Sequence, residues 1–335
     1  MSSPLQTVWD ISNEYSKRPR YAAVYNQGCF EVSERVKEWL HTTRPCEFGY
    51  PDSFKDIFAS STIPNSDGTD RERQSIDNDV ALVLYELMAG SINYCYWYGK
   101  SDVRPNGSSS AAMYALLDAV FEKEPMRLYD DSTIYHNTIF NRFSTSLINE
   151  RFPMVKDRLR HLSELKSGTA LSPECSTGMR YSYPAGVMFA NQLARHRDEK
   201  PLEEWLSILI CMFPGFGEDL FLKRASLFFM MLNRKMGWFN NEIGILPVPS
   251  DYQLPKILRH FGAINYLGPL SDAISKDELI PEGSRAECEI RSATILACKN
   301  IAERAKCSMA QVDDWIWANR KITDAPFHLT ITTNY

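Results

Sequence analysis

Apolar residues recur every three or four positions along most of this chain, which is the spacing of amphipathic helices. Stripes of this kind run through residues 79–88, 110–121, 202–209, 220–236, 253–262 and 287–305. Residues 140–165 repeat the pattern with a basic face, and only residues 329–333 favour a strand. We therefore predict a mainly α protein.

Residues at the ends of these stripes support the predicted helices. Ser308 and Gln311 have the spacing of a capping box, which would open a last helix. Gly262 ends a short stripe and suits the left-handed position that follows a helix. Ser110 is expected to cap the stripe that it begins. Residues 91–99 are expected to leave the preceding helix as an aromatic loop.

Polar and small residues divide the chain into two predicted lobes. Residues 46–75 are rich in Ser, Asp, Pro and Thr, which indicates a long surface loop. A second stretch of this composition, 166–185, is interpreted as a connection. We predict an N-terminal helical lobe at 1–165 and a C-terminal helical lobe at 186–335.

Composition excludes several classes of protein. The 335 residues carry a formal net charge of −5, so the molecule as a whole is not expected to be a bulk polyanion binder, although a local basic groove stays open. Eight cysteines show no Cys-x-x-Cys or zinc-finger spacing and are expected to be reduced. No signal peptide or membrane span is seen. We expect a cytoplasmic protein with no membrane partner, no metal and no cofactor, since phosphate-loop and dinucleotide motifs are missing.

Asp251 is the first candidate for chemistry, because it lies in a proline-containing turn directly before a helical stripe. A carboxylate there can act as a general base or stabilise a cationic transition state. The same position suits a plain helix N-cap. The adjacent Tyr252 can hydrogen-bond to a base or stack on it, and it is equally suited to packing.

Two cationic pairs are candidates for binding phosphate. Lys223 and Arg224 lie inside an apolar stripe, where a buried charge needs a partner. The partner would be either an acidic residue at 218–219 or a substrate phosphate. Lys256 and Arg259 share a helical face, which forms either a cationic clamp or a solvated basic surface.

A third candidate group is aromatic and consists of Tyr96, Trp97 and Tyr98. Enzymes that act on a base within a duplex extrude it and hold it between aromatic faces. Aromatic clusters also pack into cores, so both interpretations stay open. Glu289 and Arg291 are interpreted as structural residues, paired to the basic helix.

Six short segments occur in the order in which they are found in one known family, and together they span about a third of the chain. They are residues 213–216, 221–225, 250–258, 262–266, 283–284 and 289–291. Through them the chain resembles the queuosine-salvage family. The resemblance implies a helical, DNA-glycosylase-like fold in two closely packed lobes. It also implies an enzyme that releases a deazaguanine base from its nucleoside.

Departures from the family's pattern favour a related phage branch, the alpha-glutamyl/putrescinyl thymine pyrophosphorylases. Residues 247–250 are Pro-Val-Pro-Ser rather than the usual Phe-Ala type, Gln253 replaces Arg, and Lys256 replaces Gln. The branch implies a DNA thymine hypermodification transferase, in which an amino acid or polyamine displaces pyrophosphate from an activated hydroxymethyluracil. The expected partners are DNA containing a modified pyrimidine and a small amine or amino-acid donor. If the chain is phage-encoded, its location is the host cytoplasm.

In this hypothesis Asp251 deprotonates or orients the amine. The cations stabilise the departing pyrophosphate; they are Lys223, Arg224, Lys256 and Arg259. One alternative is a queuosine-type nucleoside hydrolase, in which Asp251 activates water against the anomeric carbon. A second alternative, from a different class, is a non-catalytic helical module that binds nucleic acid or another protein.

Overall fold

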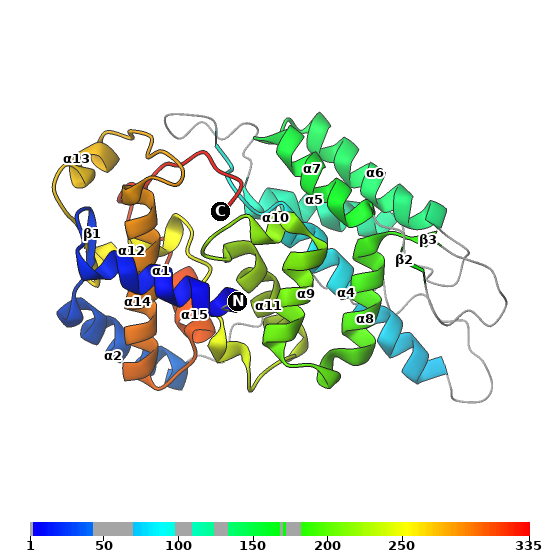
Figure 1. The fold of residues 1–335 in the computed structure, drawn as a ribbon, viewed down its shortest axis with the longest axis horizontal. Helices are drawn as coiled ribbons and strands as arrows, with labels where there is room; N and C mark the ends of the chain where they lie inside the picture. The colour runs from blue at the N-terminus through cyan, green and yellow to red at the C-terminus, as the bar shows by residue number, and fades with distance from the viewer. Residues whose placement is uncertain (1–2, 43–69, 98–108, 124–132, 168–169, 172–181) are drawn as a thin grey trace. The chain divides into compact units, whose positions relative to one another are not determined.

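The computed structural model describes residues 3–42, 70–97, 109–123, 133–167, 170–171 and 182–335, and helices dominate them (Figure 1). The prediction of a mainly α protein is confirmed. The chain forms two compact units. Unit 1 contains residues 1–47, 97–103 and 218–335, and unit 2 contains residues 48–96 and 104–217. Both predicted lobes contribute to unit 1, and the lobe boundaries stay a prediction.

Unit 1 is built around one long buried helix, α14 (Arg285–Ala305). Helices α1 (Pro4–Lys17) and α2 (Asn26–Thr42) pack against it, as Figure 1 shows. The other elements of the unit are β1 (Ala22–Val24), α11 (Lys223–Met236), η3 (Ile243–Ile245), α12 (Gln253–His260), β4 (Ile264–Tyr266), α13 (Leu270–Ser275) and α15 (Met309–Ala318). A helix surrounded in this way must be apolar, or must give each of its buried charges a partner.

A two-stranded sheet joins the two ends of unit 1's sequence. Strands β1 and β4 are antiparallel, with Ala22 opposite Tyr266 and Val24 opposite Ile264. Beside this sheet the backbone of α2 approaches Gly262 very closely. A Cβ added to Gly28 would lie 2.1 Å from the carbonyl carbon of Gly262, so this packing requires glycine.

Unit 2 is a group of helices with one short hairpin. Its elements are α4 (Asp70–Ser91), α5 (Ser110–Lys123), α6 (Thr133–Asn149), α7 (Val155–Lys166), β2 (Ala170–Leu171), β3 (Ser182–Tyr183), α8 (Ala185–His196), η2 (Arg197–Glu199), α9 (Leu202–Met212) and α10 (Pro214–Gly217). Helices α4 and α8 pack together, and α7 packs on α4, α6 and α8. The buried Arg158 of α7 donates hydrogen bonds to the carbonyl oxygens of Ile92, Tyr94 and Cys95, and so fixes the segment that follows α4.

Several predicted helix ends are confirmed, and others move. Ser308 and Gln311 form the capping box of α15, and Gly262 has the left-handed φ of 68° expected after α12. The cap of α5 is Ser109 rather than Ser110, because the Ser109 hydroxyl is the group that accepts from Ala112 N. The basic stripe at 140–165 is two helices, α6 and α7.

Two further expectations are corrected. The stripe at 220–236 becomes helical only at Lys223, because the Asp219 carboxylate binds the amides of Phe221 and Lys223 and holds the chain in a turn. The expected strand at 329–333 is only an isolated bridge between Leu279 and Leu329 within the described residues. The loop expected at 46–75 lies mostly outside them.

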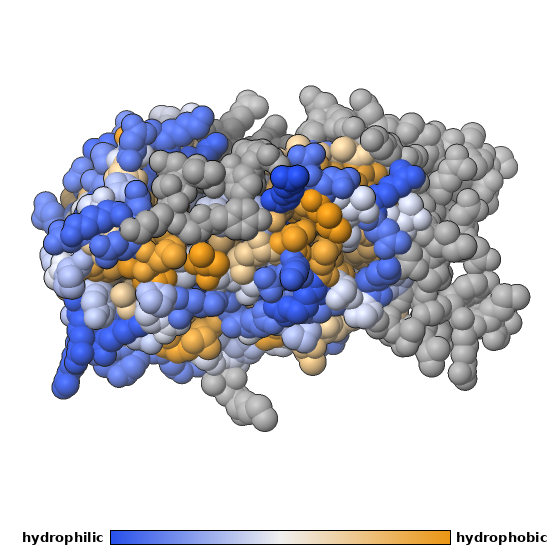
Figure 2. All heavy atoms as spheres, turned by 90° about the horizontal axis from the view of Figure 1, so that it is seen from above, coloured by the Kyte–Doolittle hydropathy of each residue, from blue (hydrophilic) through white to orange (hydrophobic). Residues whose placement is uncertain are grey.

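Polar side chains surround separate apolar patches on the face drawn in Figure 2. Among the residues that the structure describes, no helix is both long enough and apolar enough to cross a membrane.

Candidate functional site

The start of α11 buries two cations side by side in unit 1. Lys223 is 3% exposed and Arg224 is fully buried. Arg224 lies 4.0 Å from the carboxylate of Glu218, which fits the ion-pair alternative for this residue. Asp219, the other expected acidic partner, instead forms a bidentate ion pair with Arg291, with both N–O distances at 2.7 Å.

The turn before α12 places Asp251 in the same buried, charged environment. Its Oδ1 accepts hydrogen bonds from Gln253 N at 2.7 Å and Leu254 N at 3.3 Å, so Asp251 binds the first amides of the helix from the position before the N-cap residue, Tyr252. The side chain is 6% exposed, and this burial raises the pKa of Asp251 to about 6, while the positive charge of Lys223 acts in the opposite direction. Although it binds two amides, the Asp251 carboxylate thus has a pKa near neutrality, which suits a general base.

The pKa of Lys223 is shifted in the opposite direction to that of Asp251. Burial lowers the pKa of its ammonium group to about 8, while the negative charge of Asp251 acts to raise it. The positive charge of Arg224 adds to the lowering. A lysine with this pKa can hold a proton near pH 7 and can also give it up, which an ordinary lysine cannot do.

A second buried carboxylate, missed by the sequence analysis, belongs to Asp313 of α15. It binds Arg234 at 2.6 Å and is fully buried. Its negative charge raises the pKa of Asp251, after burial itself. The burial of Asp313 could have been predicted from the sequence. It lies four residues after Met309 and three before Ile316, which places it on the apolar face of the helix.

The predicted aromatic group divides between the two units. In unit 1 the rings of Trp97 and Tyr252 pack edge to face, with centroids 4.5 Å apart, and the ring centroid of Phe327 lies 4.7 Å from that of Tyr252. We call Trp97, Tyr252 and Phe327 the aromatic trio. Tyr96 belongs to unit 2, where its hydroxyl bonds to Asn93, and Tyr98 lies outside the described residues. Sequence analysis had not singled out Phe327.

The second cationic pair is found on α12 in a more open setting. Lys256 is partly buried, which lowers its pKa, while the negative charge of Asp324 acts in the opposite direction. Arg259 donates to the Ser271 hydroxyl at 2.9 Å and stacks over the ring of Tyr266 at 4.7 Å. Arg259 thus has partners within unit 1, and phosphate binding by either residue stays a prediction.

Glu289 and Arg291 are structural, as expected, but their partners are not on the basic helix. Glu289 accepts hydrogen bonds from the amides at 20–22, which lead into β1, and from Arg285. Arg291 binds Asp219 and the carbonyl oxygen of Ser250.

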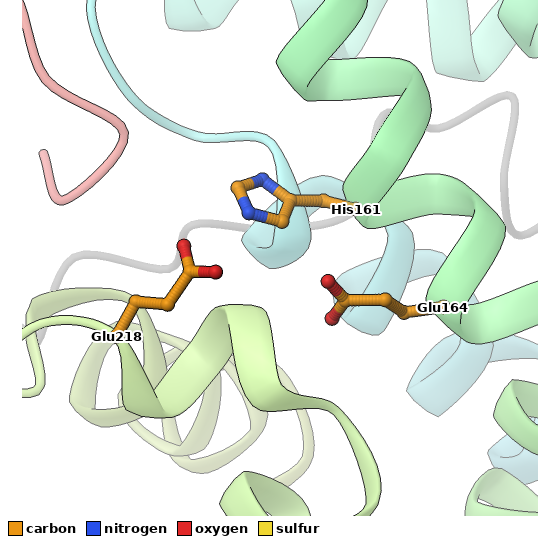
Figure 3. A group of neighbouring side chains, drawn as sticks. All are labelled: His161, Glu164 and Glu218. Carbon is orange, nitrogen blue, oxygen red and sulfur yellow. The ribbon is translucent and has the colours of Figure 1, made fainter.

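In unit 2, His161 and Glu164 project from one helix, α7 (Figure 3). The Tyr94 hydroxyl and His161 Nδ1 lie 3.0 Å apart, and Glu164 accepts from Gly215 N at 2.9 Å. A Cβ on Gly215 would lie 2.5 Å from His161 Cδ2. This close approach explains why glycine stands in the segment at 213–216.

The chain that folds in this way is similar in sequence to proteins of queuosine salvage. A family model described as "Queuosine salvage protein" matches residues 220–335, which include α11, the Asp251 turn and α12. The chain is 27% identical to a protein of Sphaerobacter thermophilus over 79% of this chain and 85% of that relative. It is 23% identical to a Mus musculus protein over 68% of this chain and 69% of that relative. Both are named queuosine 5'-phosphate N-glycosylase/hydrolase.

These comparisons confirm the resemblance to the queuosine-salvage family and correct the predicted reaction. The hypothesis of a DNA thymine hypermodification transferase is wrong, because the relatives are named N-glycosylase/hydrolases. The modified-DNA and amine-donor partners expected with it have no support from these relatives. The departures at 247–250, Gln253 and Lys256 therefore do not indicate a different reaction. They alter one turn of a region that matches the family model throughout its length.

Proposed function

We propose that this chain is a nucleotide N-glycosidase, which hydrolyses the bond between the ribose and the deazaguanine base of queuosine 5'-phosphate or a close analogue. The observation that carries the proposal is the buried pair of Lys223 and Asp251, whose pKa values lie on either side of neutrality. The names of the relatives support the same reaction.

Asp251 acts as the general base in this proposal. Its Oδ1 is held by the amides of Gln253 and Leu254, so the carboxylate has a fixed orientation and its second oxygen can accept a proton from water. The water oxygen forms a bond to the anomeric carbon as the bond from that carbon to the base nitrogen breaks. The negative charge of Asp251 also stabilises the cationic character that develops on the sugar.

Lys223 acts as the general acid. The electron pair of the broken bond moves to the base nitrogen, and the ammonium group of Lys223 supplies a proton to the departing base. The net reaction consumes one water and leaves Asp251 protonated and Lys223 neutral. Proton transfer from Asp251 to Lys223, directly or through solvent, restores the starting state.

The remaining candidates bind the substrate. Trp97 and Tyr252 of the aromatic trio are proposed to contact the planar base, because Tyr252 directly follows Asp251 and its ring packs against Trp97. The cations Arg224 and Lys256 are proposed to attract the 5'-phosphate, since guanidinium and ammonium groups form charge-assisted hydrogen bonds with phosphate oxygens.

Release of the free base tests the proposal. Purified protein is incubated with queuosine 5'-phosphate, and separately with queuosine, and free queuine is measured by mass spectrometry. We expect release by the wild type and a loss of about 100-fold or more in Asp251→Asn. The matched control is Asp272→Asn, an exposed carboxylate of α13, which should leave the rate unchanged. No release from either substrate would refute the function, and an active Asp251→Asn would refute its mechanism.

A further inference from the structure

We propose that Arg291 is a positioning residue, which fixes the distance between Lys223 and Asp251 by binding the two segments that carry them. The inference rests on the proposed function, because it concerns the same pair of side chains. Arg291 lies in the buried middle of α14 and is 1% exposed, so it acts on the pair through its neighbours.

The first connection leads from Arg291 to Lys223. The two terminal nitrogens of the guanidinium group each donate to one oxygen of Asp219 at 2.7 Å. The same carboxylate accepts from Lys223 N at 2.7 Å and from Phe221 N at 3.0 Å. One carboxylate therefore joins Arg291 to the first turn of α11, and this turn sets where the Lys223 side chain begins.

The second connection leads from Arg291 to Asp251. Arg291 Nε donates to the carbonyl oxygen of Ser250 at 3.1 Å. The Ser250 hydroxyl donates in return to the carbonyl oxygen of Arg291 at 3.2 Å. Ser250 directly precedes Asp251, so this pair of bonds holds the backbone from which the catalytic carboxylate extends.

The guanidinium group itself has little freedom to move. The rings of Phe221 and Tyr335 stack on it at 4.5 and 4.4 Å, and Glu287 lies 3.5 Å away. Only arginine can donate to two oxygens of Asp219 and to Ser250 at once, because its donors form a planar fork. A lysine would keep the charge and lose this geometry.

A change in that distance has a specific electrostatic signature. The positive charge of Lys223 lowers the pKa of Asp251, while burial and the negative charge of Asp313 raise it. If Lys223 moves away, the lowering contribution weakens and the pKa of Asp251 rises. Because Arg291→Lys conserves charge, such a rise would report geometry rather than a missing charge.

The experiment compares Arg291→Lys and Asp219→Asn with Arg285→Lys. Arg285 lies on the same helix and binds Glu289 and the carbonyl of Arg18, but neither segment of the pair. For each protein we would measure the pH dependence of kcat and KM for base release. The titration of the Asp251 carboxyl would be followed by NMR of protein labelled with carboxyl-¹³C aspartate, with its signal assigned by its loss in Asp251→Asn.

We expect kcat to fall about tenfold or more in Arg291→Lys and Asp219→Asn, with little change in KM. The Asp251 titration and the acid limb of the rate profile should both move up by about one pH unit. Arg285→Lys should leave both in place, even if it lowers the melting temperature.

An unchanged Asp251 titration in folded Arg291→Lys, with a rate that falls only with the folded fraction, would show that Arg291 is merely structural and would overturn the inference. If Arg291→Lys does not fold, Asp219→Asn decides, because it breaks the same ion pair and keeps an amide oxygen for Phe221 N. The loss of the Asp219 charge would by itself lower the pKa of Asp251, so a rise would again report displacement of Lys223, and no rise would overturn the inference. A wild-type protein that releases no base would refute the proposed function instead, and the NMR titration would still test the positioning.

Discussion

Lys223 and Asp251 lie in the same buried charged region, and each acts on the other's pKa against the effect of burial. Burial favours the neutral form of both side chains, and the opposite charge of the partner favours the ionised form. The outcome is a base with a pKa of about 6 and an acid with a pKa of about 8.

We expect base release to have a bell-shaped pH dependence. Asp251 must be ionised to accept a proton, so kcat/KM should rise as the pH increases through about 6. Lys223 must be protonated to donate one, so the rate should fall as the pH increases through about 8. Initial rates measured from about pH 5 to pH 9 check both limbs. A rate that keeps rising above pH 8 would remove Lys223 as the acid.

Trp97 should contribute to binding of the base, and the neighbouring Tyr96 should not. Stacking on a base contributes about 1–3 kcal/mol, so Trp97→Leu is expected to raise KM about tenfold with a smaller effect on kcat. Tyr96→Leu removes an aromatic ring from the unit that does not hold the trio and should affect melting temperature rather than KM. Equal effects of the two substitutions on KM would contradict the assignment of the trio to substrate.

Gly28→Ala should destabilise unit 1. The new methyl group would lie 2.1 Å from the backbone of Gly262, so α2 would have to move away from β4 at a cost of about 1–3 kcal/mol. Gly244→Ala is the control, because a Cβ there meets nothing within 4 Å. Urea denaturation checks the difference, and equal midpoints for the two variants would show that α2 has room to adjust.

His328 should make the folded protein sensitive to acid. Burial, with a further contribution from the charge of Arg291, lowers the pKa of His328 to about 3. In the unfolded chain His328 takes up a proton near pH 6.5. The free energy of unfolding is therefore unaffected by this residue above about pH 6.5, and it falls by about 1.4 kcal/mol for each pH unit below that value.

The variant His328→Gln should therefore lose less stability than the wild type between about pH 6.5 and pH 4.5. Denaturant titrations at several pH values provide the test. His41→Gln, on the exposed end of α2, is the control and should keep the wild-type dependence. The same slope in His328→Gln and wild type would show that other groups cause the acid sensitivity.

Local features of the fold could be predicted from the sequence, because a capping box or a glycine after a helix acts within a few residues. Ser308 and Gly262 are examples. The partner of Asp219 could not be predicted, since Arg291 lies 72 positions away and the cations Lys223 and Arg224 are much nearer in the sequence.

In the candidate site, too, features set by neighbouring residues could be predicted and contacts between distant residues could not. Lys223 was a candidate because it is a charge inside an apolar stripe, and the family resemblance added weight to Asp251, which lies in the turn before α12. Their catalytic roles stay predictions. Phe327 was missed because nothing near it in the sequence indicates that it meets Tyr252. Asp313 could have been predicted from local sequence, because it lies on the apolar face of α15.

The pairing of β1 with β4 has a consequence for synthesis of the chain. Residues 22–24 leave the ribosome early, but their partners at 264–266 are made some 240 residues later. All of unit 2 is translated in between. Helices α1 and α2 of unit 1 therefore cannot complete their packing until β4 and α14 have been synthesised. By then the whole sequence of unit 2 is already present. We expect the proposed catalytic unit to be the last part of the nascent protein to fold.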